Sequence, residues 1–235
     1  MINVDTDQSR YTAPNGRLFI IGCPKNDIPE EVILAHFINL IGNQARIEVV
    51  VANDIKINED FSKYEAAFIG MGAAHVGRMD ANEVVSGDIL ARINQAHAVL
   101  IAGRGIDFEN QLLEILRQRY NADRLTIAGT NGAALEQFTT GFKGVANIFI
   151  DTECSKNGPN IGTFGRLKDT NVTFGICVEE DAACVIDGGV NAEVIGNGVV
   201  YLVDGSRASN TPNMLTHNLR VDILSTGQSF TIPPQ

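Results

Sequence analysis

Tryptophan is absent from the sequence, and aromatic and basic residues are few. Aromatic residues make up 6% of the 235 residues, so small and aliphatic side chains must fill most of the core. Lysine and arginine number 18 against 28 aspartates and glutamates, which gives a net charge of −10. Binding to nucleic-acid backbones and to anionic membrane surfaces depends on clustered Lys and Arg. The composition therefore argues against both as partners.

Long apolar runs and closely spaced cysteines are also missing. No run approaches the roughly 20 apolar residues that span a bilayer, and the polar N-terminal extension, residues 1–15, does not resemble a signal peptide. The cysteines are scattered, without a C-x-x-C pair: Cys23, Cys154, Cys177 and Cys184. We therefore predict a cytoplasmic protein with buried, reduced thiols rather than a disulfide or a zinc site. We expect no cofactor.

Strand-like and helix-like segments alternate through the first two thirds of the chain. Apolar runs of strand length lie at 17–22, 46–52, 65–70, 98–103 and 125–130. Helical patterns lie at 29–42, at 89–96, after a capping Asp107 and at 133–138. Such alternation predicts an α/β fold: a mainly parallel sheet with helices on both faces.

The pattern changes after about residue 147, where short strands are separated by turns. The expected strands lie at 147–151, 173–178, 183–186, 193–195, 199–203 and 218–224. Turn signals lie at 187–189 and at 196–198, and the second resembles a hairpin connection. We predict C-terminal antiparallel β-ribbons, and one domain over 16–235.

The strand-to-helix turn at 129–134, Gly-Thr-Asn-Gly-Ala-Ala, is the most informative segment for chemistry. Ligands of an open α/β sheet bind beyond the carboxyl ends of its strands. Small residues around such a turn are typical of a nucleophile elbow, and the helix start offers N–H groups to an anion. Asn131 at the tip is no nucleophile but tolerates positive φ, so it can keep the bend without the reactivity. Thr130 should point away from the tip, and an ordinary glycine-rich turn is the alternative.

These residues and others in the same order resemble the cyanophycinase and aspartyl-dipeptidase family of serine hydrolases, which carries G-T-S-A-G-A at this turn. The other similar blocks are 16–22, 45–51, 98–103 with 111–113, 148–153, 164–167, 175–182, 193–200 and 218–232. The resemblance implies a flavodoxin-like (class I glutamine-amidotransferase-like) fold. Because the family is dimeric, it also implies a homo-oligomer, with assembly with another chain as the alternative.

The sequence departs from the family at its catalytic positions. The resemblance places Asn131 at the nucleophilic Ser and Glu153 at the catalytic His. It also places Ile106 at a substrate-binding Gln and Arg104 at a Gly of the same motif. A catalytic triad works as a unit, so loss of both nucleophile and base leaves at most a weak residual rate. We therefore predict a catalytically inactive member that acts through a retained pocket or through assembly.

Other polar groups are candidates for the pocket. The candidate pocket residues are Arg104, Ile106, Thr130, Gly132, Arg166, Glu179 and Glu180. The family layout implies that Glu153, Cys154 and the charge run 179–181 lie near one another, although such runs usually form solvated loops. Of the histidines, only His75, in the glycine-rich stretch 70–77, has a position from which it could reach the pocket.

Two further functions stay open at this point. One is a working hydrolase of isopeptides or Asp-containing peptides that uses non-standard residues, with a peptide as its ligand. The other is a sensor of a small anion, which Arg104 and the helix start behind Asn131 would hold. Arg104 has a competing role, since it can pair with Glu153 or Glu179 and fill the pocket. No spacing of His, Cys, Asp or Glu predicts a metal site.

Overall fold

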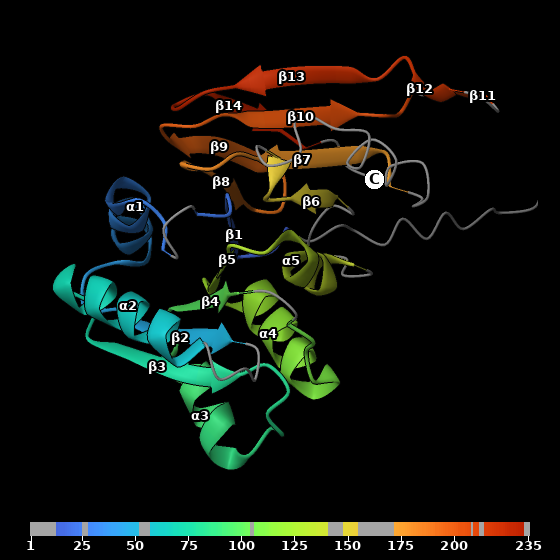
Figure 1. Cartoon of the computed structure of the whole chain (residues 1–235). Helices are drawn as coiled ribbons and strands as arrows, with labels where there is room; N and C mark the ends of the chain where they lie inside the picture. The colour runs from blue at the N-terminus through green and yellow to red at the C-terminus, as the bar shows by residue number, and fades with distance from the viewer. Residues whose placement is uncertain are drawn as a thin grey trace, which may run out of the picture.

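The computed structural model describes residues 13–24, 28–51, 57–103, 106–140, 148–154, 172–207, 209–211 and 214–232 (Figure 1). These residues form an eight-stranded sheet, a four-stranded sheet and a two-stranded ribbon, with helices around the larger sheet. Among them, no helix has the length and apolar character needed to cross a membrane.

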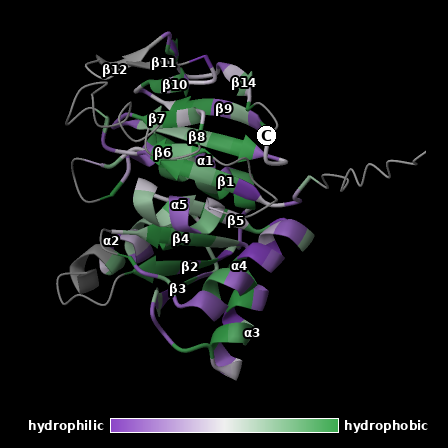
Figure 2. Ribbon diagram, turned by 90° about the vertical axis from the view of Figure 1, so that its right-hand side faces the viewer, coloured by the Kyte–Doolittle hydropathy of each residue, from purple (hydrophilic) through white to green (hydrophobic). Residues whose placement is uncertain are grey.

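Five strands of the larger sheet run parallel. They are β1 (Arg17–Ile21), β2 (Arg46–Val51), β3 (His75–Asp80), β4 (Ala98–Ala102) and β5 (Thr126–Gly129), in the order β1-β5-β4-β2-β3. The inner strands β2, β4 and β5 are rich in Val, Ile and Ala and almost fully buried, as expected of strands covered on both sides, and Figure 2 shows the strands largely hydrophobic, whereas the edge strand β3 carries His75, Arg78 and Asp80.

Helices cover both faces of these strands, as the sequence predicts. On one face, α1 (Glu31–Ile41) and α2 (Ile57–Gly70) pack Phe37 and Phe68 against each other and Phe37 on Phe19 of β1. The other face carries α3 (Gly87–Gln95), α4 (Asn110–Ala122) and α5 (Gly132–Thr139). In Figure 1, α1 and α2 lie to the left of the sheet, and α4 and α5 lie to the right.

Three antiparallel strands extend the same sheet, so it is mixed rather than mainly parallel. β8 (Ala182–Asp187) pairs with β1, β9 (Asn191–Gly196) pairs with β8, and β14 (Ser229–Thr231) forms the edge. The predicted turn at 187–189 joins β8 to β9, and Gly188 and Gly189 have positive φ there. The expected C-terminal ribbons are thus partly built into the main sheet.

The second sheet contains β6 (Phe149–Asp151), β7 (Phe174–Val178), β10 (Val200–Asp204) and β13 (Arg220–Leu224), in the order β13-β10-β7-β6. One face of it packs on the helix-covered core through residues such as Ile150, Ile176 and Leu202. β6 and β7 are parallel, which corrects the expectation of purely antiparallel ribbons. The ribbon of β11 (Ser209–Thr211) and β12 (Met214–His217) was not expected from the sequence.

The predicted hairpin at 196–198 is wrong, because β9 and β10 belong to different sheets. Instead, the N–H groups of Asn197 and Gly198 both donate to the carbonyl oxygen of Asp181. Gly196 has φ +93°, and a Cβ there would collide with the same carbonyl. Glycine is therefore needed where the chain crosses from one sheet to the other.

Two other local predictions are also wrong. Residues 65–70, expected to be a strand, form the end of α2, where Tyr64 and Phe68 stack one turn apart on the core side. The strand is β3 instead, so His75 begins a strand at the amino edge and not at the carboxyl edge where a ligand would bind. The N-cap of α4 is Glu109 rather than Asp107, because the Glu109 side chain accepts a hydrogen bond from the Leu112 N–H.

Candidate functional site

The turn between β5 and α5 has ordinary backbone geometry. Asn131 has φ −123° and ψ 114°, so the expected positive φ of an elbow is wrong. Its Oδ1 accepts a hydrogen bond of 3.0 Å from the Ala134 N–H, which makes Asn131 the N-cap of α5. Asn is among the best N-cap residues. The alternative interpretation, an ordinary strand-to-helix turn, describes this segment better.

A buried threonine from the second sheet holds the same turn. The Thr152 hydroxyl accepts a hydrogen bond from the Gly132 N–H and donates one to the Thr130 carbonyl, both at 3.1 Å. The Thr152 carbonyl accepts a hydrogen bond from the Cys23 N–H at 2.6 Å. We refer to these three hydrogen bonds as the Thr152 clamp. It joins the ends of β1, β5 and β6, and no sequence pattern pointed to it.

The clamp changes what the start of α5 can bind. The N–H groups of Gly132 and Ala134 already donate to the side chains of Thr152 and Asn131. A Cβ at Gly132 would collide with the carbonyl oxygen of Ile150, so β6 packs directly on the helix start. The helix N-terminus is therefore largely satisfied by oxygens of the same chain, which leaves little capacity for an outside anion.

Glu153 and Cys154 follow the clamp residue directly. The Glu153 N–H donates to Asp151 Oδ1 at 2.8 Å, a local turn that fixes the half-buried backbone here. Cys154 is joined to Cys177 of β7 by a disulfide, with 6.0 Å between the Cα atoms. The prediction of reduced thiols is therefore wrong for this pair. Register explains the pairing, because Asp151 lies beside Cys177 and the chain turns back over β7.

The other two cysteines remain thiols in the structure. Cys23 is half-buried and Cys184 lies fully inside the core of the main sheet. Burial raises the pKa of the Cys184 thiol far above its ordinary value. This thiol is therefore protonated and unreactive at physiological pH.

Glu179 lies two residues beyond Cys177, at the end of β7. The Tyr201 hydroxyl of β10 donates to Glu179 Oε1 at 2.8 Å. This hydrogen bond, followed by burial, raises the pKa of Tyr201. The two side chains meet because Tyr201 pairs directly with Cys177, which places it on the face of the sheet that also carries Glu179. No motif or spacing in the sequence pointed to Tyr201.

The remaining candidates are placed as follows. The expected solvated loop at 179–181 is instead half-buried, and Asp181 has φ +62° where its carbonyl holds the crossing at 196–198. Ile106 is buried, and its carbonyl accepts a hydrogen bond from Gln137 of α5. Arg104 and Arg166 lie outside the described residues. The structure thus connects Thr130, Asn131 and Gly132 to the segment that carries Glu153, and Cys154 to the strand that carries Glu179.

Comparison with known proteins gives one consistent result. Curated cyanophycinases of Trichormus variabilis and Nostoc sp. are each 24% identical over 271 residues, covering 97% of this chain and 88% of the relative. A cyanophycinase of Geminocystis herdmanii is 22% identical over 251 residues, covering 91% and 92%. The chain is cyanophycinase-like. No protein-family model matches the sequence. The similarity to these cyanophycinases extends over nearly the whole length of the chain.

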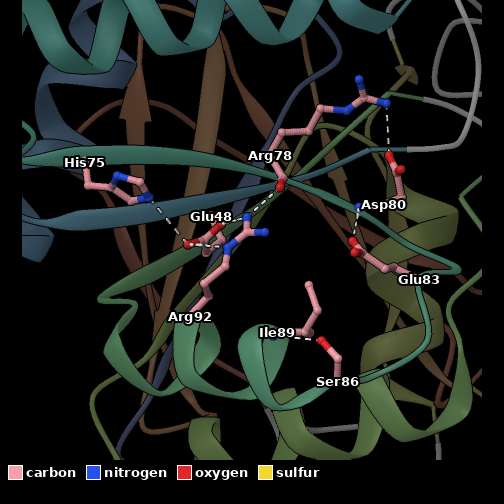
Figure 3. Close-up of polar contacts among 8 residues, drawn as sticks. All are labelled: Glu48, His75, Arg78, Asp80, Glu83, Ser86, Ile89 and Arg92. Atoms are coloured by element: carbon pink, nitrogen blue, oxygen red, sulfur yellow. Dashed lines mark hydrogen bonds and ion pairs between the residues drawn. The ribbon is translucent and has the colours of Figure 1, made fainter.

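The cyanophycinase-like chain also holds a buried ion pair far from the Thr152 clamp, at the β3 edge of the main sheet (Figure 3). Glu48 of β2 is 1% exposed, and its carboxylate meets Arg92 of α3 at 2.5 Å and 3.4 Å. Arg92 also donates to the Arg78 carbonyl at 2.5 Å, and His75 Nε2 lies 3.8 Å from Glu48. Gly77 lies opposite Glu48, where any Cβ would collide with the carboxylate.

The charged groups of this ion pair are engaged with one another inside the fold, away from the carboxyl edge of the sheet where a ligand would bind. The hydrogen bond to Glu48 raises the pKa of Arg92, against the effect of burial. The pair connects the edge strand β3, through β2, to α3. The sequence signal for this pair is a single Glu inside the apolar run at 46–51, which was not among the candidate site residues.

A cavity of about 370 Å³ lies on the α1 side of the antiparallel strands. Its polar lining includes Arg17 and Asp187, which form an ion pair at 3.1 Å, together with His36 and Glu193. Among the predicted site residues that the structure describes, none lines this cavity. A second group of potential ligand atoms lies at the disulfide, where Asp151, Cys154 and Cys177 come within 4.8 Å of one another.

Proposed function

We propose that this cyanophycinase-like protein has lost serine-peptidase chemistry and acts through binding or assembly. The observation that carries the proposal is the role of Asn131 at the position that resembles the family's nucleophile. Its side-chain oxygen caps α5 at 3.0 Å, and its backbone is extended rather than strained. An amide in this position has no ionisable proton that a base could remove, so it cannot begin acyl transfer.

The positions that would assist a nucleophile are also altered. Glu153 takes the place that resembles the catalytic His, and a carboxylate there has no hydroxyl at residue 131 to activate. Two N–H groups at the start of α5, which would suit an oxyanion, donate within the chain. Nucleophile, base and oxyanion donors are thus all replaced or occupied, which supports loss of the reaction more strongly than one substitution would.

The proposal includes the origin of the fold. The order β3-β2-β4-β5 follows the first four positions of the flavodoxin-like order 2-1-3-4-5, and β1 takes the fifth position. This order supports a flavodoxin-like parallel core to which β8, β9 and β14 were added. We further propose one domain over 16–235 and a homo-oligomer. Light scattering coupled to gel filtration measures the latter, and a monomer at micromolar concentration would refute it.

Two other functions have less support. A hydrolase with non-standard residues would need a reactive group near the turn, but Glu179 is engaged by Tyr201 and Cys154 by Cys177. A small-anion sensor would need the start of α5, which the Thr152 clamp and the Asn131 cap already use. We therefore keep the hydrolase only as an outcome of the experiment and do not propose the anion sensor.

The experiment is a peptidase assay on the purified full chain. Cyanophycin, β-aspartyl dipeptides and isopeptides are incubated with the wild type and with Asn131→Ala, and released amino groups are measured. We expect no release above buffer for either protein. Release by the wild type that Asn131→Ala abolishes would refute the proposal directly. Equal release by both would indicate a hydrolase that uses other residues.

A further inference from the structure

We propose that Cys154 and Cys177 form a thiol–disulfide exchange site whose oxidation state controls how firmly the Thr152 clamp holds the turn at 130–132. The site uses neither the nucleophile position nor the base position of the proposed function, although it borders Glu153 and acts on the turn that carries Asn131. It therefore stands or falls independently of peptidase activity.

The two cysteines are placed for reversible pairing. Each is 2% exposed, and they lie 23 residues apart in the sequence at the ends of adjacent strands. The Asp151 carboxylate lies within 4.8 Å of both sulfurs. A nearby negative charge disfavours two thiolates side by side. Formation of the disulfide removes the two groups that could otherwise become charged beside this carboxylate.

The disulfide acts on the turn through a short piece of backbone. Cys154 is two residues after Thr152, and the Glu153 N–H between them donates to Asp151. Thr152 in turn contacts the Thr130 carbonyl and the Gly132 N–H. With the disulfide formed, the backbone from β6 to Cys154 is fixed at both ends. After reduction, Cys154 is no longer tied to β7, and the backbone beyond Asp151, where the pairing of β6 with β7 ends, is held only by hydrogen bonds such as those of the clamp and of the Glu153 N–H.

The exchange chemistry needs a small disulfide as oxidant and a dithiol as reductant. In oxidation, one cysteine thiolate attacks the oxidant and releases one thiol, and the second cysteine attacks the resulting mixed disulfide and releases another. The two cysteine protons end on the two released thiols, and two electrons pass to the oxidant. A dithiol reverses both steps and itself becomes a disulfide. Because both cysteines are buried, exchange requires a brief local opening.

The first measurement counts thiols by mass after alkylation in denaturant. Protein treated with glutathione disulfide should carry two alkylated cysteines, Cys23 and Cys184, and a cross-linked peptide pair. Protein treated with dithiothreitol should carry four. Four alkylated cysteines after the oxidant would overturn the proposal. Stoichiometric zinc uptake by the reduced protein at the expense of thiol reactivity would also overturn it, because the group would then be a metal site.

The second measurement tests the coupling to the turn. Closing a segment of this length stabilises a protein of this size by a Tm difference of roughly 6–12 °C between the oxidised and reduced forms. Amide hydrogen exchange at 130–134 should be about tenfold faster or more after reduction. Equal Tm and equal exchange in the two states would refute the coupling. No substrate enters either readout.

Variants make the assignment specific. Cys154→Ser and Cys177→Ser should each abolish the redox dependence of Tm and of exchange at 130–134. Cys184→Ala, which removes a core thiol outside both the pair and the Thr152 clamp, should keep both differences. A redox difference that survives in Cys154→Ser would refute the site. If a variant at the pair does not fold, chemical reduction of the wild type still tests the proposal.

Discussion

The Thr152 hydroxyl lies 3.1 Å from the Gly132 amide nitrogen and 3.1 Å from the Thr130 carbonyl oxygen, so one side chain bonds both sides of the turn around Asn131. Thr152 follows β6 of the second sheet, whereas the turn belongs to the main sheet. This contact unites the two sheets at the edge where a ligand of an α/β protein would bind. It also explains why the residue at the tip has relaxed geometry, since the backbone is held from outside the turn.

Replacing Thr152 tests the clamp. Thr152→Val keeps the shape but leaves the Gly132 N–H and the Thr130 carbonyl without partners, which should cost about 2–4 kcal/mol of unfolding free energy. Thr152→Ser keeps the hydroxyl and loses one buried methyl, which should cost about 1 kcal/mol. Urea unfolding of the three proteins measures both values. A loss near zero in Thr152→Val, smaller than that in Thr152→Ser, would mean that packing, and not hydrogen bonding, is what Thr152 provides.

Asn131 offers a matched pair of substitutions for its capping role. Asn131→Ala removes the acceptor for the Ala134 N–H and should lower the unfolding free energy by about 1 kcal/mol. Asn131→Ser provides another good cap and should stay within a few tenths of a kcal/mol of the wild type. Thermal and urea unfolding give the comparison. A large loss in both variants would indicate that the amide has another partner.

The same position allows a test for regained chemistry. Asn131→Ser alone should stay inactive on β-aspartyl dipeptides, because no imidazole lies at residue 153 to act as base. Asn131→Ser combined with Glu153→His restores both groups that the family resemblance implies, and weak hydrolysis by this double variant would support the inferred ancestry. Hydrolysis by the single variant would show that another base serves the turn.

The sequence predicted the parallel strands well, because runs such as 17–22 and 46–52 have strand length and no polar face. It failed at 65–70, since a short apolar run fits a helix as well as a strand, and packing of Phe68 against α1 decides between them. The disulfide was not predictable, because it depends on the register between β6 and β7, which places Asp151 beside Cys177 although the two residues are distant in the sequence. The backbone conformation at Asn131 was not predictable for the same reason, because it is held by hydrogen bonds to Thr152, which is also distant in the sequence. Local pattern thus specified elements, and contacts between distant segments specified the site.

Tyr201 and Glu179 give a prediction about alkaline pH. The hydrogen bond to Glu179 raises the pKa of Tyr201 in the folded state above its unfolded value of about 10. Its contribution is therefore fully present below pH 10 and is lost as the pH rises through the folded pKa. The stability difference between wild type and Tyr201→Phe, about 0.5–1 kcal/mol at pH 8, should shrink above pH 10. Ultraviolet titration of both proteins measures this pKa. The absorbance change that the wild type shows and Tyr201→Phe lacks should occur at a higher pH than the change from the other tyrosines.

The buried ion pair at the β3 edge should respond unequally to loss of its two partners. Arg92→Leu leaves the Glu48 carboxylate, 1% exposed, without its cation and should cost about 3–5 kcal/mol. Glu48→Leu leaves a guanidinium that is 25% exposed and near water, so the cost should be only about 1–2 kcal/mol.

The double variant Glu48→Leu with Arg92→Leu separates burial of a charge from loss of attraction. Because it removes the isolated carboxylate, it should be more stable than Arg92→Leu alone, although it carries one more substitution. Urea unfolding of the four proteins completes the cycle. The loss in the double variant could instead equal the sum of the two single losses. The unpaired Glu48 carboxylate would then not be what destabilises Arg92→Leu, and Arg92 would matter only through its contact with the Arg78 carbonyl.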